Sequence, residues 1–368
     1  MTAYHDHDHV HDHVHPYVSL PAQPSSSGHP ISRRRMITLL SGAALALVAC
    51  DGKDTRNEPS TPASGTPGPS PSSPSSSATP TASPVTPGGA TRSLDAGGPF
   101  SAFPTRVRTR TAGGQLYVES DGMPDHPMMI GIRSWQQQVP LPQPYTGSNA
   151  WSVPLEGVLS NNPVSAKTAL YRGAIALAAN GVPIFNALNN RGDDALLAGE
   201  LDQWGGHSGR ADDYHYHVAP LHLQSVLGAA APIAYALDGF PLYGLTEPDG
   251  SPVSGLDEFN GHLDGGGRYH YHATLTYPYI NGGMRGVVQV RDDQVDPQPA
   301  AAPVRPALTP LRGATITGFK TLAANRFSLE YQVDSQVFTL NYGFEGNTYT
   351  FEFVDPSGGK RTETYARR

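Results

Sequence analysis

Two stretches of this chain repeat one another, and this internal duplication constrains the fold more than any other feature. In each stretch a Gly-His pair is followed, after six residues, by Tyr-His-Tyr-His, and the two stretches lie 55 residues apart. A further matching pair of segments, residues 175–185 and 233–243, lies 58 residues apart, so the copies differ by a three-residue loop deletion. The period is too long, and the copies too few, for a solenoid. We therefore predict one β-rich domain built from two pseudo-symmetric units, residues 173–219 and 231–274.

The rest of the chain also favours a mainly β fold. Its main part is rich in Gly and Pro and has short apolar runs, of which residues 174–179 and 195–201 allow a helix without arguing strongly for one. A Pro-rich stretch at residues 296–310 predicts a linker. Beyond it apolar and polar residues alternate, which predicts a small antiparallel β-module at residues 311–368. The main domain is then expected at residues 99–295.

The first hundred residues predict export and lipid anchoring. Ser32-Arg33-Arg34-Arg35-Met36-Ile37 resembles a twin-arginine signal, and the apolar run after it is too short to cross a bilayer of about 30 Å. The run ends in Leu47-Val48-Ala49-Cys50, which resembles a lipobox. Residues 1–49 are therefore predicted to be a signal peptide and Cys50 the acylated start of the mature chain. Residues 50–98, mostly Pro, Ser, Thr, Gly and Ala, are predicted to be a disordered spacer.

Composition narrows the classes of function. Cys50 is the only cysteine, which excludes an internal disulfide and, once it is acylated, a thiolate-ligated blue-copper centre. The net charge of −7 argues against a nucleic-acid partner. A Gly-X-Ser-X-Gly elbow, a P-loop and His-Glu-X-X-His are all missing from the sequence, so nucleophilic hydrolases, nucleotidases and common metalloproteases lack support. The expected location is the cell envelope outside the cytoplasm, with the membrane contacted through lipid on Cys50.

The duplicated histidines predict a metal site. Side chains at positions i and i+2 of a strand share a face, so His215 and His217 point one way and Tyr214 and Tyr216 the other. On a helix the two histidines would lie about 200° apart and could not meet one ion. Such a strand pair supplies two imidazoles to Zn²⁺ or Cu²⁺, and the histidine before each motif is a natural third ligand across a hairpin. The predicted ligands are His207, His215, His217, His262, His270 and His272.

Five more residues are assigned to the predicted site or its surroundings. His126 is a further candidate ligand, because the methionines that follow it would suit copper, although such methionines are also common core residues. Asp213 precedes the first motif and is expected to orient an imidazole, whereas Arg268 stands at the equivalent place in the second copy. The first copy is therefore the better candidate if only one site binds metal. The remaining predicted neighbours are Asp238, Tyr214 and Tyr269, for which turn chemistry and core packing are the alternatives.

These motifs resemble the YHYH domain of bacterial exported proteins. The resemblance rests on the paired Tyr-His-Tyr-His motifs, on Asp238-Gly239-Phe240-Pro241-Leu242-Tyr243-Gly244 and on Gly122-Met123-Pro124-Asp125-His126. It covers roughly residues 105–290. It implies an exported protein and supports the domain boundaries, and it implies no particular reaction.

Three functions stay open on the sequence alone. The first is a lipid-anchored protein that binds divalent copper or zinc through the duplicated triads, and its partner would be a metal-accepting protein. The second is a non-enzymatic surface module, for adhesion or envelope binding, whose histidines are structural. The third is a metal-dependent enzyme that acts on an envelope polymer, and no catalytic residue is assigned to it. The histidine tract from His5 to His15 also binds metals in principle, but it is lost if the signal is cleaved.

Overall fold

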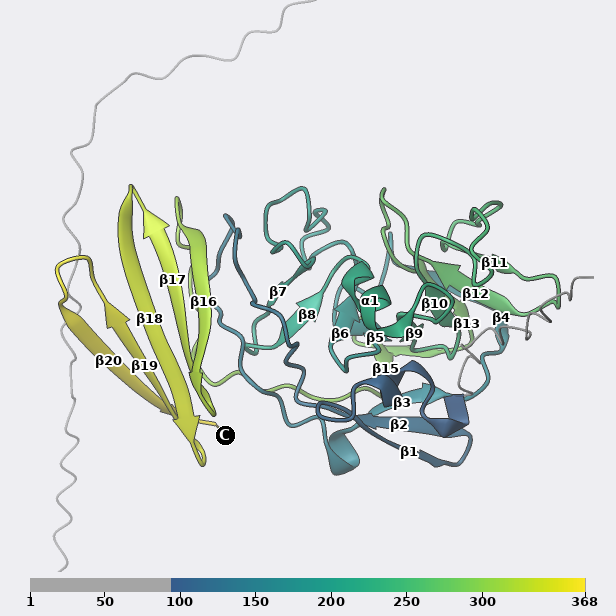
Figure 1. The fold of residues 1–368 in the computed structure, drawn as a ribbon, viewed down its shortest axis with the longest axis horizontal. Coiled ribbons are helices and arrows are strands. Elements are labelled where there is room, and N and C mark those ends of the chain that lie inside the picture. The colour runs from purple at the N-terminus through teal and green to yellow at the C-terminus, as the bar shows by residue number, and fades with distance from the viewer. Residues whose placement is uncertain (1–93, 368) are drawn as a thin grey trace, which may run out of the picture. The chain divides into compact units, whose positions relative to one another are not determined.

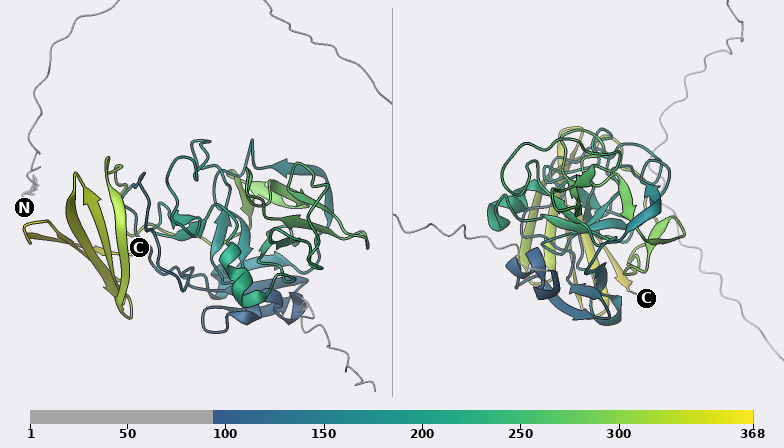
Figure 2. Two further views of the ribbon diagram at one scale, coloured as in Figure 1. Left: turned by 45° about the horizontal axis from the view of Figure 1, so that its top comes forward. Right: turned by 90° about the vertical axis from the view of Figure 1, so that its right-hand side faces the viewer.

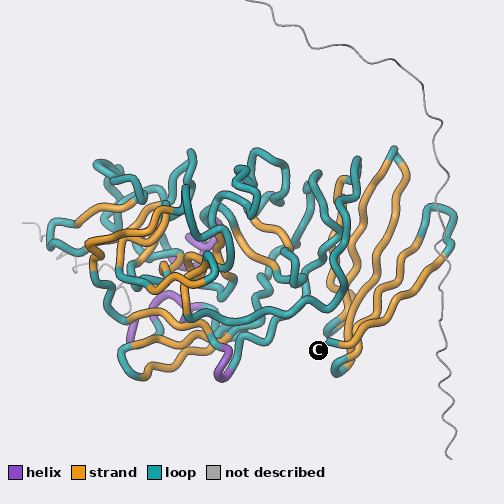
Figure 3. Tube along the Cα trace, turned by 180° about the vertical axis from the view of Figure 1, so that it is seen from behind, coloured by secondary structure: helices purple, strands orange, loops and turns teal. Residues whose placement is uncertain are grey.

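The structure is a computed structural model that describes residues 94–367. The predicted signal peptide, the lipobox with Cys50 and most of the predicted spacer lie outside these residues. Strands and loops make up most of the described chain, and its helical segments are short (Figure 3). None of the described helices has the length and apolar character needed to span a membrane. The helical segments are η1 (Leu94–Ala96), η2 (Gly98–Ala102), η3 (Gly147–Asn149), η4 (Leu221–Leu223) and α1 (Gln224–Leu227).

An eight-stranded sheet holds both predicted repeat units. Its strand order is β11-β12-β10-β9-β5-β6-β8-β7. The first unit supplies one half of the sheet and the second unit the other half, so the order reads the same from both ends once the repeated strands are matched (Figure 1). The strands are β5 (Ala174–Ala178), β6 (Pro183–Phe185), β7 (Gly206–Ser208), β8 (Tyr214–Tyr216), β9 (Ala234–Ala236), β10 (Pro241–Tyr243), β11 (Gly261–Leu263) and β12 (Tyr269–His272).

The two halves meet at an antiparallel pair of strands, β5 and β9. Leu177 lies opposite Tyr235, and the alanines on either side pair reciprocally, Ala176 with Ala236 and Ala178 with Ala234. Within each half the histidine strand runs parallel to the second strand of its unit, β8 beside β6 and β12 beside β10. Strand order and pairing are thus symmetric about the Leu177–Tyr235 pair.

The apolar run at residues 174–178 is a strand and not a helix. All five residues of β5 are buried, because the strand lies in the middle of the sheet with neighbours on both sides. A strand buried on both faces has a continuous apolar sequence, which periodicity alone cannot distinguish from a short helix. The run at residues 195–201 forms turns and irregular backbone.

Three smaller sheets complete the main part of the chain. The first has three antiparallel strands in the order β1-β2-β3, and each of the other two is an antiparallel pair, β4 with β13 and β14 with β15. The strands are β1 (Arg108–Ala112), β2 (Gln115–Glu119), β3 (Trp151–Pro154), β4 (Leu159–Ser165), β13 (Gly283–Gly286), β14 (Gln289–Arg291) and β15 (Gln294–Asp296).

The C-terminal part is a five-stranded antiparallel sheet in the order β16-β17-β18-β19-β20, coloured yellow-green to yellow in Figures 1 and 2. Phe327 and Leu329 of β17 and Tyr349 and Phe351 of β19 are buried, as their alternation with polar residues predicted. The mainly β fold with a small antiparallel C-terminal module is therefore confirmed. The strands are β16 (Thr315–Ala323), β17 (Arg326–Val333), β18 (Gln336–Glu345), β19 (Thr348–Val354) and β20 (Lys360–Ala366).

The segment expected to be a linker, residues 296–310, contains a buried ion pair with the first repeat unit. The Arg305 guanidinium Nη2 lies 2.5 Å from Asp212 Oδ1, and both side chains are almost fully buried. Burial raises the pKa of Asp212, while the charge of Arg305 opposes this shift. Removing either partner would leave an unpaired buried charge, so this contact fixes the segment beside the loop that precedes β8.

Candidate metal centres

The first predicted triad converges in the structure. His207 on β7 lies directly opposite His215 on β8 in the antiparallel hairpin, and His217 follows β8 on the same face. The Nε2 atoms of His207 and His217 are 3.1 Å apart. One ring nitrogen from each of the three histidines lies within 4.8 Å of the others. The i, i+2 spacing on a strand and the hairpin register together produce this convergence.

Backbone carbonyls fix which ring nitrogen carries the hydrogen. The Nδ1 of His217 is 2.5 Å from the carbonyl oxygen of Asn186, and the Nδ1 of His215 is 3.0 Å from that of Asp213. A carbonyl oxygen only accepts hydrogen bonds, so both Nδ1 atoms are donors and the Nε2 atoms of the neutral rings carry lone pairs. The His207 ring also has a hydrogen bond to the backbone of Glu200. The Nε2 lone pair of His217 therefore faces the ring of His207, as in a metal site whose ligands are oriented by their outer hydrogen bonds.

Burial keeps His207 and His217 in the unprotonated form. It lowers the pKa of His217 to about 3, with a smaller contribution from neighbouring His215. The pKa of His207 is also well below its usual value, first because of burial and then because His215 and His217 lie close by. A charged imidazole would lose its hydration here without gaining an anionic partner. The neutral form that binds metal is therefore the form present near neutral pH.

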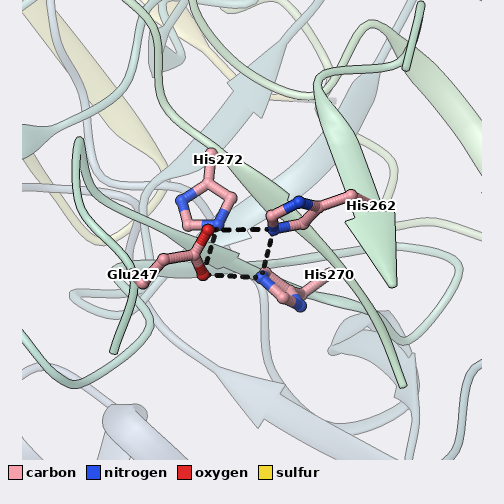
Figure 4. A group of neighbouring side chains, drawn as sticks. All are labelled: Glu247, His262, His270 and His272. Atoms are coloured by element: carbon pink, nitrogen blue, oxygen red, sulfur yellow. Dashed lines mark hydrogen bonds and ion pairs between the residues drawn. The ribbon is translucent and has the colours of Figure 1, made fainter. Parts of the chain in front are cut away.

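The second triad converges in the same way, and a carboxylate joins it (Figure 4). His262 on β11 lies opposite His270 on β12, and their Nε2 atoms are 3.0 Å apart. Glu247 lies in the loop after β10, and its carboxylate oxygens are 3.1 Å from the Nε2 of His262 and 3.3 Å from those of His270 and His272. The Nδ1 of His272 is 3.1 Å from the carbonyl of Gly244, the counterpart of Asn186 in the first copy.

The surroundings of one buried nitrogen, the Nε2 of His272, bear on whether the second group can hold a cation. The Nδ1 of His272 donates to a carbonyl, so its fully buried Nε2 carries a lone pair, and this atom has no hydrogen-bond partner. It faces a carboxylate oxygen of Glu247 that can also only accept. Two acceptors at this distance repel one another unless a cation or an added proton lies between them. Ligands about 2.0–2.1 Å from a tetrahedral zinc ion are about 3.3–3.4 Å apart, close to the separations seen here.

The two groups are separate sites. The strands that carry them, β8 and β12, have four strands between them in the sheet. At a strand spacing of about 4.8 Å, this separation is roughly 24 Å measured along the sheet. One shared ion cannot contact both groups, so the two triads are separate candidate sites.

The tyrosines of each motif lie on the opposite face and hold the hairpins in register. The hydroxyl of Tyr214 donates to Asp202 at 2.7 Å, and that of Tyr269 donates to Asp257 at 2.9 Å. The counterparts Asp202 and Asp257 also accept the backbone N–H of Gly206 and Gly261, at 3.2 Å in both cases. The tyrosine rings and their carboxylate partners thus stabilise the β7–β8 and β11–β12 hairpins from the face away from the histidines.

The four residues predicted to surround the ligands, Asp213, Asp238, Tyr214 and Tyr269, differ in what their side chains contact. Asp213 lies beside His215, with 3.6 Å between Asp213 Oδ2 and the ring Nδ1, while the closer contact comes from its backbone oxygen. Asp238 has no hydrogen bond to a triad histidine and instead accepts from the Tyr271 hydroxyl at 2.5 Å. Tyr214 and Tyr269 bind the aspartates named above. Of these four residues, only Asp213 therefore contacts a triad histidine through its side chain.

His126 joins neither triad. Its Nε2 is 2.9 Å from the hydroxyl of Tyr216, and its ring stacks on Trp204 with 4.7 Å between the ring centroids. The ring of His222 packs edge-on against it, and burial lowers the pKa of His222 to about 4. Met128 and Met129 are buried in the core, which is the alternative that the sequence left open for them. His126 thus belongs to an aromatic cluster on the tyrosine face of β8.

Sequence reasoning missed Glu247. The residue has no acidic counterpart in the first copy, where Asn189 stands at the same position 58 residues earlier. The only feature of the sequence that points to Glu247 is its position, five residues after Leu242, in the loop that leads from β10 back toward the histidine strand β12. Aligning the two copies identifies the residues that both share. It does not identify a ligand that is present in one copy only.

The first group opens onto a cavity of about 720 Å³. All three triad histidines line this cavity, together with Asn189, Arg191 and Glu200. Cavities of this size accommodate small organic ligands. The first triad can therefore be reached by a ligand from outside the sheet.

Comparison with known proteins identifies the domain. A family model described as YHYH protein matches residues 150–252, which include the first triad and the first strands of the second unit. No curated protein matches the chain. No solved structure matches it. The matched segment contains the first Tyr-His-Tyr-His motif and Asp238-Gly239-Phe240-Pro241, so residues 150–252 are similar to the YHYH protein family, as the motifs predicted.

Proposed function

We propose that this protein binds divalent transition metal ions, copper or zinc, at two histidine centres while it is anchored outside the cytoplasm by lipid on Cys50. The observation that carries the proposal is the pair of ring nitrogens in the first group, His207 Nε2 and His217 Nε2, which lie 3.1 Å apart. The Nδ1 of His217 donates to the carbonyl of Asn186, so the Nε2 of this ring has a lone pair for a cation. A bound cation would be coordinated by both nitrogens.

The proposal also rests on the repetition of this arrangement. The hairpin register, the facing Nε2 atoms and the outer carbonyl bond of the last histidine all occur in both copies. Histidines that only stabilise a sheet would donate to carboxylates or carbonyls through whichever nitrogen is closest. Here a ring nitrogen from each of three histidines lies within 4.8 Å of the others in each copy, which favours metal binding over a module with structural histidines.

The lipid anchor and export route are supported by the N-terminal sequence alone. The arginines before the apolar run and the Leu-Val-Ala-Cys sequence after it support export followed by acylation of Cys50. In that setting the spacer would hold the metal-binding domain away from the membrane. A metal-accepting protein or an envelope polymer is the partner class that this location favours.

Metal analysis of the protein purified from its native compartment tests the proposal. We expect copper or zinc to be present at up to two ions per chain and to remain after brief dialysis against a weak chelator. A variant with alanine at all six triad histidines should contain neither ion above background. Equal metal content in this variant and the wild type would contradict the proposal and favour the surface module.

A further inference from the structure

The two centres differ at one equivalent position. Glu247 and Asn189 occupy the same place in loops that are closed by equivalent bridges, Thr246 with Pro252 and Leu188 with Asp194. Both bridges and both central residues are 58 positions apart. The backbone of the two loops therefore follows the same course, and the difference lies in the side chain that each loop offers.

In the second group, the side chain of Glu247 in this loop completes the set of ligands around the centre. The oxygens of Glu247 lie within 3.3 Å of all three histidine Nε2 atoms, so the carboxylate occupies the fourth corner around them. It also adds one negative charge to three neutral ligands. An ion held by His262, His270, His272 and Glu247 has four protein ligands, the number found in closed zinc sites.

In the first group the equivalent side chain points elsewhere. The Asn189 amide donates to the Glu200 carboxylate at 3.2 Å, and Arg191 forms an ion pair with the same carboxylate. Glu200 is thus engaged by two donors, and among the described residues the first group contains histidines alone. The side of this triad not covered by protein ligands faces the cavity of about 720 Å³.

We propose that the first centre is an open metal site that takes a small anion from the cavity as its fourth ligand, whereas Glu247 closes the second centre. This inference rests on the proposed metal binding. Three neutral imidazoles leave both charges of a divalent ion uncompensated, which favours an anion over a neutral ligand. The cavity wall adds Arg172 and Arg210, neither of which has an acidic partner among the described residues. The ligand class is a small anion with an oxygen or nitrogen donor atom.

Azide binding to the copper-loaded protein tests the proposal. The double variant His270→Ala/His272→Ala leaves only the first centre, and His215→Ala/His217→Ala leaves only the second. Each variant of the exported full chain is loaded with one equivalent of Cu²⁺ and titrated with azide, and the azide-to-copper charge-transfer absorption is recorded. The variant with all six triad histidines replaced is the blank, because the tract from His5 to His15 also binds copper where it is retained.

We expect saturable azide binding at the first centre and binding at least about tenfold weaker at the second. Asn189→Glu in the first-centre variant should weaken azide binding to the level of the second centre, whereas Asn189→Gln, which matches glutamate in size without its charge, should retain it. If Asn189→Glu does not fold, Glu247→Gln in the second-centre variant should gain azide binding. Equal azide affinity at both centres, or copper binding at both without azide binding at either, overturns the inference. Failure of the single-centre variants to bind copper at all would instead contradict the proposed function.

Discussion

At the scale of single residues, the triad histidines could be predicted from the sequence and Glu247 could not. His215 and His217 share a face because strand geometry has a period of two, and the same spacing recurs at His270 and His272. Glu247 reaches its histidines through the course of a loop, which no local periodicity encodes. His126 is a different case: its neighbouring methionines suggested a ligand, and in the structure its Nε2 lies 2.9 Å from the hydroxyl of Tyr216.

The glycines before the first histidine of each triad are predicted to be essential for the hairpins. A Cβ at Gly206 would lie 2.5 Å from the Tyr214 hydroxyl oxygen, and one at Gly261 would lie 2.1 Å from that of Tyr269. Gly206→Ala and Gly261→Ala should each lower the free energy of unfolding by about 1–3 kcal/mol, because the buried tyrosine must move from its aspartate. Denaturant unfolding measures this change.

Gly265→Ala is the matched control for both variants. Its Cβ would have no atom within 4 Å, so the stability of this variant should equal that of the wild type. Glycine variants as stable as this control would show that the tyrosine contacts do not hold the hairpins in register.

At the scale of elements, the sequence predicted the type of structure better than its arrangement. The matched motifs predicted strands and a hairpin in each unit, and both are present. The pairing of β5 with β9 at the centre, and the parallel placement of β8 beside β6, could not be read from the sequence, because they depend on contacts between distant segments. The alanine-rich run at residues 174–178 was equally ambiguous until its two neighbouring strands were known.

The two repeat units are predicted to superpose residue by residue. In a crystal structure of the protein, the Cα atoms of residues 173–219 should overlay those of residues 231–274, with Asn180 on Asp238 and His215 on His270. The physical reason is that matched sequences with the same hairpin register bury the same faces. A best superposition that pairs other residues would refute the duplication.

At the scale of the whole molecule, Cys50→Ala is predicted to release the protein from the membrane. Each acyl CH₂ buried in the bilayer contributes about 0.8 kcal/mol, so two or three chains hold the protein and their loss frees it. Membrane fractionation should place the wild type with the lipids and the variant in the soluble exported fraction. If the Cys50→Ala variant still sediments with membranes in high salt, a part of the protein other than Cys50 attaches it to the membrane.

The export route has its own test in the paired arginines before the apolar run. Replacing both Arg33 and Arg34 by Lys keeps the positive charge of the signal and removes the twin-arginine motif. We expect the variant to accumulate inside the cell, as cell fractionation and immunoblotting would show. Unchanged export would indicate an export route that recognises only the positive charge and the apolar run of the signal.

The central claim, that the chain holds two separate histidine metal centres, is tested most directly by calorimetric titration with Zn²⁺. Relative to the variant that lacks all six triad histidines, the wild type should bind two equivalents. His215→Ala/His217→Ala and His270→Ala/His272→Ala should each bind one, because each pair removes two of the imidazoles at a single centre. A titration in which either double variant binds as much Zn²⁺ as the wild type would contradict the account and leave those histidines as structural residues of the sheet.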